Sequence, residues 1–171
     1  MKKLMSMILF SLPLMASVLI TPKDALKATF GESVKVKKKP LLIKTSQAVS
    51  IQKKAKAKLE SKIVRLYVAK QKDIVAYGVL LNRNVRTKKT AVLYMITPDG
   101  QLKAAEIVAF KEPIEYLPTE TWMDQFRDVN DSKSLRMGAG VSVITGATMS
   151  ARTISDGARL AMAIFEEAIK K

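Results

Sequence analysis

Residues 63–81 read IVRLYVAKQKDIVAYGVLL and contain two apolar runs separated by Lys70-Gln71-Lys72. Runs of this length that are rich in Val, Ile, Leu and Tyr are typical of strands, and a three-residue connection suits a hairpin. Two more runs follow at 91–97 and 102–110. Between them Pro98-Asp99-Gly100 predicts a turn, because Pro fixes φ and Gly admits a positive φ. The pattern therefore predicts four neighbouring strands in an antiparallel meander.

Helical segments are predicted before and after this meander. We expect a strand at 34–44 and helices at 22–30, 47–61 and 153–170. Thr45 or Ser46 is expected to cap the helix at 47–61. A further short helix is expected after a cap at Thr119 or Thr121. The apolar residues of the second helix recur at helical spacing and its lysines cover the other side. Such a helix could lie on a membrane, but its apolar face is largely Ala, so we expect it to dock on a sheet. We predict a single-domain α+β fold, an antiparallel sheet with helices packed against it.

Composition narrows the possible chemistry. The chain has 171 residues, which suits one domain with an ordinary core, and it contains neither Cys nor His. The missing Cys excludes disulfides, thiolate metal sites and Cys nucleophiles. The missing His excludes imidazole-dependent triads, axial His ligation of haem and most catalytic zinc sites. Any chemistry must come from carboxylates, hydroxyls, amines or a bound cofactor.

Positive charge is concentrated in the first half of the chain. The formal net charge is +15, and residues 1–90 alone hold 21 Lys and Arg against four Asp and Glu. This asymmetry indicates a basic face, which suits nucleic acid, anionic lipid or an acidic protein, or is simply solvated. The basic run 35–39 has no interleaved aromatic residues, and an exported chain rarely meets nucleic acid, so we do not expect nucleic acid as the partner.

The N-terminal segment has the pattern of an export signal. Lys2 and Lys3 precede an apolar stretch from Leu4 to Ile20, which is slightly short for a membrane span and contains Pro13. We predict a signal peptide or retained anchor at 1–21, a domain at 22–171, and a location in the periplasm or on the outer face of the cytoplasmic membrane. No clean A-x-A cleavage site follows, so a membrane-associated, uncleaved form stays open.

The segment 142–153, SVITGATMSART, carries the candidate chemistry. Gly146 and Ala147 allow close approach of a ligand, and Thr145, Thr148 and Ser150 supply hydroxyls just before a predicted helix. A helix N-terminus offers unpaired N–H groups and partial positive charge, which together favour a phosphate. The alternative from spacing alone is an ordinary loop and helix cap.

The motif Thr145-Gly146-Ala147-Thr148 resembles the S/T-G-A-T flavinylation motif of extracytoplasmic FMN-binding domains. These domains include the FMN-carrying subunits of Rnf and Na⁺-translocating NADH:quinone oxidoreductase complexes and smaller stand-alone relatives. The resemblance covers residues 22–171. Other matching segments, in the family's order and spacing, are Ala76-Tyr77-Gly78, Pro98-Asp99-Gly100, Glu106 to Phe110, Glu115-Tyr116 with Trp122, Gln125-Phe126, and Asp156-Gly157-Ala158-Arg159.

The resemblance implies FMN joined through its phosphate to Thr148 by a flavin transferase of the ApbE type, which uses FAD. One departure is Ser142, where the family's motif usually has Asp, so non-covalent FMN or an unmodified domain stays open. Tyr116, Leu117 and Trp122 match a cofactor-proximal segment of the family and are candidate ring walls. Core packing is an alternative of at least equal weight for all three, and for Trp122 it is the preferred one.

The function implied is electron transfer outside the cytoplasm between redox partners, such as a cytochrome or a membrane reductase. A basic face would then raise the encounter rate with an acidic partner. The alternative is a non-redox cell-envelope module whose basic half binds anionic lipid or polymer. A flavin reductase ranks third, because the chain shows no dinucleotide fingerprint.

Overall fold

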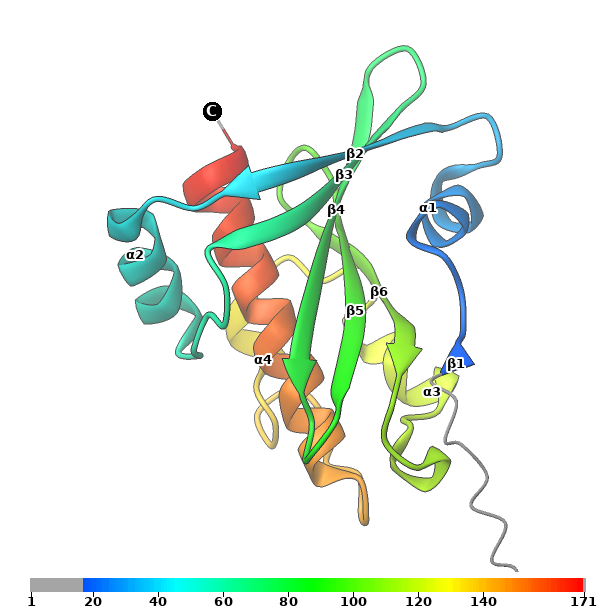
Figure 1. The fold of residues 1–171 in the computed structure, drawn as a ribbon, viewed down its shortest axis with the longest axis vertical. Helices are drawn as coiled ribbons and strands as arrows, with labels where there is room; N and C mark the ends of the chain where they lie inside the picture. The colour runs from blue at the N-terminus through cyan, green and yellow to red at the C-terminus, as the bar shows by residue number, and fades with distance from the viewer. Residues whose placement is uncertain (1–16, 171) are drawn as a thin grey trace, which may run out of the picture.

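A computed structural model describes residues 17–170 and shows one six-stranded antiparallel sheet in the order β1-β6-β5-β4-β3-β2 (Figure 1). The two edge strands are β1, which is only two residues long, and β2. The strands are β1 (Ser17–Val18), β2 (Lys35–Leu42), β3 (Ile63–Lys70), β4 (Ile74–Asn84), β5 (Lys89–Ile96) and β6 (Leu102–Phe110). The predicted meander of four consecutive strands is confirmed as β3 to β6.

Helices cover both faces of the sheet, which confirms the predicted α+β class (Figure 1). The helices are α1 (Pro22–Phe30), α2 (Thr45–Ala55), α3 (Glu120–Met123) and α4 (Thr148–Ile164), with 3₁₀ turns at Ile114–Tyr116, Asp124–Phe126 and Ser132–Leu135 and a π-helical turn at Phe165–Ile169. Helix α4 packs on β4, β5 and β6, and α2 packs beside α4. Helix α1 packs on the opposite face of the sheet.

The central contact between α4 and the sheet is made by a tyrosine and a glycine. Tyr94 of β5 is completely buried, and its hydroxyl donates a hydrogen bond of 2.9 Å to the carbonyl of Ile154 in α4. A Cβ on Gly157 would lie 2.1 Å from that hydroxyl oxygen, so any residue other than glycine would clash with the Tyr94 side chain. Burial raises the pKa of Tyr94, which keeps the hydroxyl protonated as a donor.

A buried arginine joins three segments on the other side of α4. The guanidinium of Arg159 donates to the carbonyls of Ala55, at the end of α2, and Leu135, each at 2.8 Å. It also pairs with Asp156 one turn earlier. Arg159 is 8% exposed. Because the charge is paired and its N–H groups are bonded to two carbonyls, it stabilises the meeting point of α2, α4 and the 132–135 turn.

Three predicted helix boundaries are wrong. Helix α2 ends at Ala55, because Lys56 adopts a left-handed conformation with φ of 49° and its N–H bonds back to Gln52. Its N-cap is Lys44, whose N–H donates to the side chain of Gln47, not Thr45 or Ser46. Helix α4 begins at Thr148, five residues before the expected start. The candidate motif therefore forms the first turn of the helix itself.

The predicted export signal lies mostly outside the described residues. Only its end is described, where Ser17 and Val18 pair with Phe110 and Ala109 of β6 before the chain turns into α1. Within residues 17–170, no helix is both long enough and apolar enough to span a membrane.

Candidate functional site

Thr148 is the first residue of α4, a helix of 17 residues. Its hydroxyl is half-buried and donates a hydrogen bond of 3.0 Å to the carbonyl of Ile144. Ala147 occupies the N-cap position, and no side chain caps the helix. The first N–H groups of α4 are therefore left without a side-chain partner, and they carry the partial positive charge of a helix N-terminus.

The turn before Thr148 owes its shape to glycine. Gly146 has a φ of +83°, a conformation that other residues adopt only with strain. Nothing lies within 4 Å of the position that a Cβ would take there, so the space beside the turn is open. Thr145 is exposed and Ala147 is buried. The turn thus presents Thr145 and Gly146 to solvent and anchors itself through Ala147.

Ser150 ties α4 to the segment that follows β6. Its side chain is fully buried, and its hydroxyl donates a hydrogen bond of 2.6 Å to the carbonyl of Tyr116. The hydroxyl proton of Ser150 is therefore already used in a hydrogen bond within the protein. The half-buried ring of Tyr116 is covered by Arg86, whose guanidinium carbon lies 4.8 Å from the ring centroid. The contact brings the turn between β4 and β5 to the N-terminal end of α4.

A buried carboxylate shapes that turn. One oxygen of Glu112 accepts hydrogen bonds from the backbone N–H groups of Arg86, Thr87 and Lys88, at 2.9, 2.7 and 2.7 Å. These bonds, led by the one from Lys88, hold the pKa of Glu112 below its usual range. The hydroxyl of Thr153 in α4 donates to the carbonyl of Asn84 at 3.1 Å. Both contacts fix the position of Arg86 relative to Thr148.

Replacing Glu112 with Ala should lower the free energy of unfolding by about 2 kcal/mol, because three N–H groups lose a charged acceptor. Glu112→Gln keeps an acceptor oxygen and should cost less. The pKa of Glu112 is lower in the folded than in the unfolded protein. The difference in free energy of unfolding between the wild type and Glu112→Gln should therefore be largest above the unfolded pKa of about 4.3. It should disappear as the pH falls through the pKa of the folded protein. Urea unfolding of both proteins between pH 7 and 3 measures this. An advantage independent of pH would contradict it.

Trp122 is a packing residue that also braces the motif loop. It is 8% exposed, and its ring centroid lies 5.3 Å from that of Phe126. Its indole N–H donates to the carbonyl of Ser142 at 3.0 Å, and the side-chain oxygen of Gln125 accepts from the N–H of Ser142 at 2.7 Å. The main chain at Ser142 is thus held on both sides, while its side chain is exposed.

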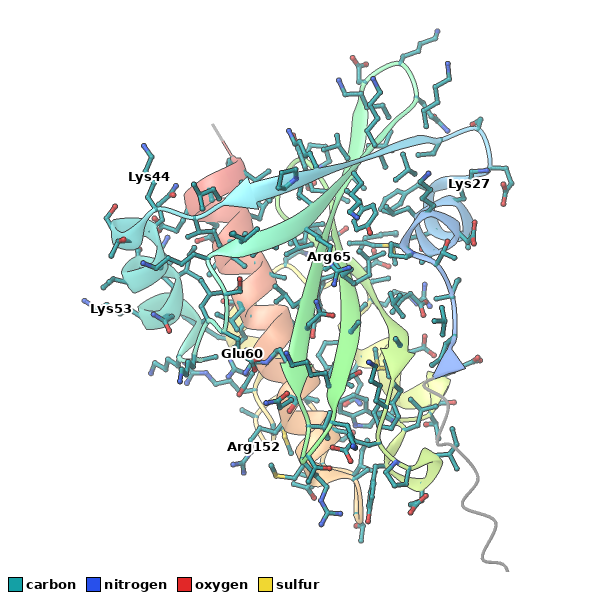
Figure 2. The ribbon with its side chains drawn as sticks, in the orientation of Figure 1. Lys27, Lys44, Lys53, Glu60, Arg65 and Arg152 are labelled. Carbon is teal, nitrogen blue, oxygen red and sulfur yellow. The ribbon has the colours of Figure 1, made fainter. Side chains whose placement is uncertain are left out.

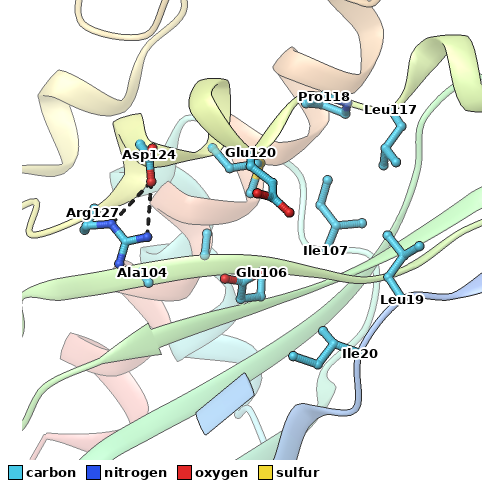
Figure 3. Close-up of a pocket in the computed structure, with 12 residues that line it drawn as sticks. Leu19, Ile20, Ala104, Glu106, Ile107, Leu117, Pro118, Glu120, Asp124 and Arg127 are labelled. Atoms are coloured by element: carbon cyan, nitrogen blue, oxygen red, sulfur yellow. Dashed lines mark hydrogen bonds and ion pairs between the residues drawn. The ribbon is translucent and has the colours of Figure 1, made fainter. Parts of the chain in front are cut away.

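Leu117 faces a cleft of about 600 Å³ between β6 and the 117–127 segment (Figure 3). The charged residues that line the cleft are Glu106, Glu120, Asp124 and Arg127, and the rest of the lining is largely apolar. Burial raises the pKa of Glu106, and the negative charges of Glu120 and Asp124 add to this while Arg127 opposes it. No residue of 142–149 lines this cleft. Trp122 does not line this cleft either, and it contacts the motif loop through the carbonyl of Ser142.

Four residues missed by the sequence analysis complete the surroundings of the motif. Val143 and Met149 flank it with side chains 57% and 47% exposed, and Ile114, in the same turn as Tyr116, is 70% exposed. Arg152 is exposed four residues after Thr148, a spacing that places the two on one side of the helix. Of these four, only the position of Arg152 beside Thr148 could have been predicted from the sequence, because it follows from helical periodicity once the helix is known to begin at Thr148.

Three aspartates in and after the α3 region form contacts within the protein. Asp124 pairs with Arg127, Asp128 pairs with Lys103, and Asp131 accepts the N–H of Lys133 at the start of a 3₁₀ turn. Among the described residues, no group of three or more Asp or Glu side chains is arranged to hold a metal ion.

Comparisons of the chain with protein-family models, with curated proteins and with solved structures found no match.

Proposed function

We propose that the protein carries FMN outside the cytoplasm, attached through its phosphate to Thr148, and transfers electrons between redox partners. The observation that carries this proposal is the position of Thr148 as the first residue of a long helix without a side-chain cap. The resemblance of Thr145-Gly146-Ala147-Thr148 to the flavinylation motif of FMN-binding domains supports it independently.

The residues around Thr148 fit a phosphodiester. Its remaining negative charge would be stabilised by the free N–H groups of the first turn, by the helix dipole and by the guanidinium of Arg152. Esterification removes the proton that Thr148 donates to the carbonyl of Ile144. That carbonyl keeps a second donor, the N–H of Ala147 at 3.2 Å, so attachment leaves it paired.

The attachment reaction balances with FAD as the donor. The hydroxyl oxygen of Thr148 forms a bond to the phosphorus of the FMN half, the phosphoanhydride bond of FAD breaks, and AMP leaves. The hydroxyl proton passes to a base of the flavin transferase of the ApbE type. When bound, FMN accepts and releases electrons, which the side chains of this chain cannot do alone. A covalent link also prevents loss of the cofactor where FMN is not replenished.

Exposed apolar side chains beside the motif can contact the flat flavin ring. Val143, Met149 and Ile114 are all roughly half exposed or more, and the carbonyl of Tyr116 is bonded to Ser150 of α4. Arg86 and the neighbouring lysines of the β4–β5 turn place positive charge at the same end of the molecule. This charge suits an acidic redox partner such as a cytochrome.

Co-production with a flavin transferase and purification of the exported chain test the proposal. The purified protein should be yellow, with a flavin absorbance spectrum that remains after denaturation and removal of small molecules. Colour lost on denaturation would indicate non-covalent FMN. A colourless protein would contradict the proposal and favour the non-redox envelope module. Oxidation of NADH or NADPH by the purified protein alone would instead favour a reductase.

A further inference from the structure

Four lysines of the first half of the chain lie along β2, one of the two edge strands of the sheet. Lys35, Lys37, Lys38 and Lys39 are all exposed. Within the part of the chain that the structure describes, none of the four forms a salt bridge. Charge of this density, with Pro40 in the same strand, prevents the edge from pairing with another sheet. The edge is therefore a free, strongly positive surface.

The lysines point to both faces of the sheet. Lys37 and Lys39 lie opposite Val68 and Leu66, which belong to the α4 side, whereas Lys38 lies opposite Tyr67 on the α1 side. A surface that approaches the sheet edge-on therefore meets lysines from both faces at once. A flat anionic surface suits this arrangement better than a ligand bound to one face.

Apolar side chains lie beside the lysines. Leu42, at the end of β2, is paired with Ile63 of β3, and the two are 71% and 66% exposed. Further along the edge, a groove of about 610 Å³ has the partly exposed Leu41 and Ile169 in its lining, with Lys39 and Lys70 and no acidic residue. Lysines next to exposed apolar side chains are the combination found at the boundary of headgroups and acyl chains.

This surface lies far from the proposed flavin site. The groove contacts Phe165 and Ile169, just beyond the C-terminal end of α4, whereas Thr148 is at its N-terminal end. A helix of 17 residues is about 25 Å long. Figure 2 shows Lys44, which follows β2, and Arg152, near Thr148, at different ends of α4. The lysines of β2 therefore lie too far from Thr148 to contact a partner that is bound at the flavin.

We propose that the β2 edge, defined as Lys35, Lys37, Lys38 and Lys39 with Leu42 and Ile63, docks on a bilayer that contains anionic phospholipid. Clusters of four or more lysines bind such surfaces, and the apolar pair adds contacts that a hydrated acidic polymer does not offer. The docked molecule presents the Thr148 end of α4 away from the lipid, where a redox partner can reach it. The docking does not depend on bound flavin.

Vesicle co-sedimentation of the full chain without flavin tests the proposal, in a buffer of about 0.1 M salt. The vesicles are phosphatidylcholine alone or phosphatidylcholine with one quarter phosphatidylglycerol. The quantity measured is the ratio of the two partition coefficients, which isolates the part of binding that requires anionic lipid. The test variant carries Lys37→Gln, Lys38→Gln and Lys39→Gln. The control variant removes the same charge from α2 and the residues after it, with Lys53→Gln, Lys56→Gln and Lys58→Gln.

The test variant should lower this ratio by about a hundredfold, and the control should lower it by less than about threefold. Leu42→Ser should lower binding to the anionic vesicles severalfold. Equal losses in both lysine variants would overturn the proposal, because net charge alone would then explain binding. A ratio near one for the wild type would also overturn it. Retention on polyphosphate that the test variant loses, without vesicle binding, would assign the edge to an acidic polymer instead.

Discussion

A Thr148→Val variant should emerge from co-production with a flavin transferase without covalently bound flavin. Valine has the shape of threonine but no hydroxyl, so the oxygen that would form the phosphoester is absent. The fold should remain, because the substitution removes only one hydrogen bond, to the carbonyl of Ile144, worth about 1 kcal/mol. Flavin fluorescence of the denatured protein on a gel measures attachment, with thermal unfolding as the check on folding.

Thr145→Val is the matched control for this result. Thr145 lies three residues before Thr148, in the same turn, and is exposed. Its hydroxyl is not the proposed acceptor, so this variant should keep most of its covalent flavin. Thr148→Ser retains a hydroxyl and should keep part of it. If Thr148→Val keeps the flavin fluorescence and Thr145→Val loses it, the acceptor is Thr145 and our proposal is contradicted.

Gly157→Ala should be the most destabilising small substitution in the core. The added Cβ would lie 2.1 Å from the hydroxyl oxygen of Tyr94 and 2.8 Å from the ring carbon that bears it. Tyr94 is completely buried against α4, so the ring has no room to withdraw. Overpacking of this kind should cost about 3 kcal/mol and lower the melting temperature by roughly 10 °C. Thermal unfolding followed by circular dichroism measures this.

A double variant shows whether the clash is the cause. Tyr94→Phe alone loses the hydrogen bond to Ile154 and should cost about 1 kcal/mol. Combined with Gly157→Ala, it removes the closest of the clashing atoms, so the two costs should sum to more than the measured cost of the double variant. Additive costs would show that Gly157 is required for another reason, such as the geometry of α4.

The strands of this fold could be predicted from sequence because their signals are local. Apolar runs of strand length and turn residues such as Gly100, whose φ is 101°, are visible without any tertiary information. The start of α4 could not be predicted in this way. Thr148, Ser150 and Thr153 have modest helix propensity, because their hydroxyls compete for backbone groups. In the folded protein, Ser150 and Thr153 bond instead to Tyr116 and Asn84, which are distant in sequence.

The surroundings of the motif depend on similar long-range contacts. Arg86 lies over Tyr116 because Glu112 fixes the turn between β4 and β5, and no spacing in the sequence indicates this. The end of α2 at Lys56 carries no glycine or proline to mark it. The uneven distribution of charge was evident from composition, but the position of Lys35, Lys37, Lys38 and Lys39 together on an edge strand required the strand order.

The mass of one tryptic peptide tests the central proposal most directly. Cleavage after Arg136 and Arg152 releases residues 137–152, which contain Ser142, Thr145 and Thr148. In protein co-produced with the transferase, this peptide should be heavier by one FMN less one water, and its fragments should place the addition on Thr148. A peptide of unmodified mass, or an addition on any other hydroxyl, would contradict the account.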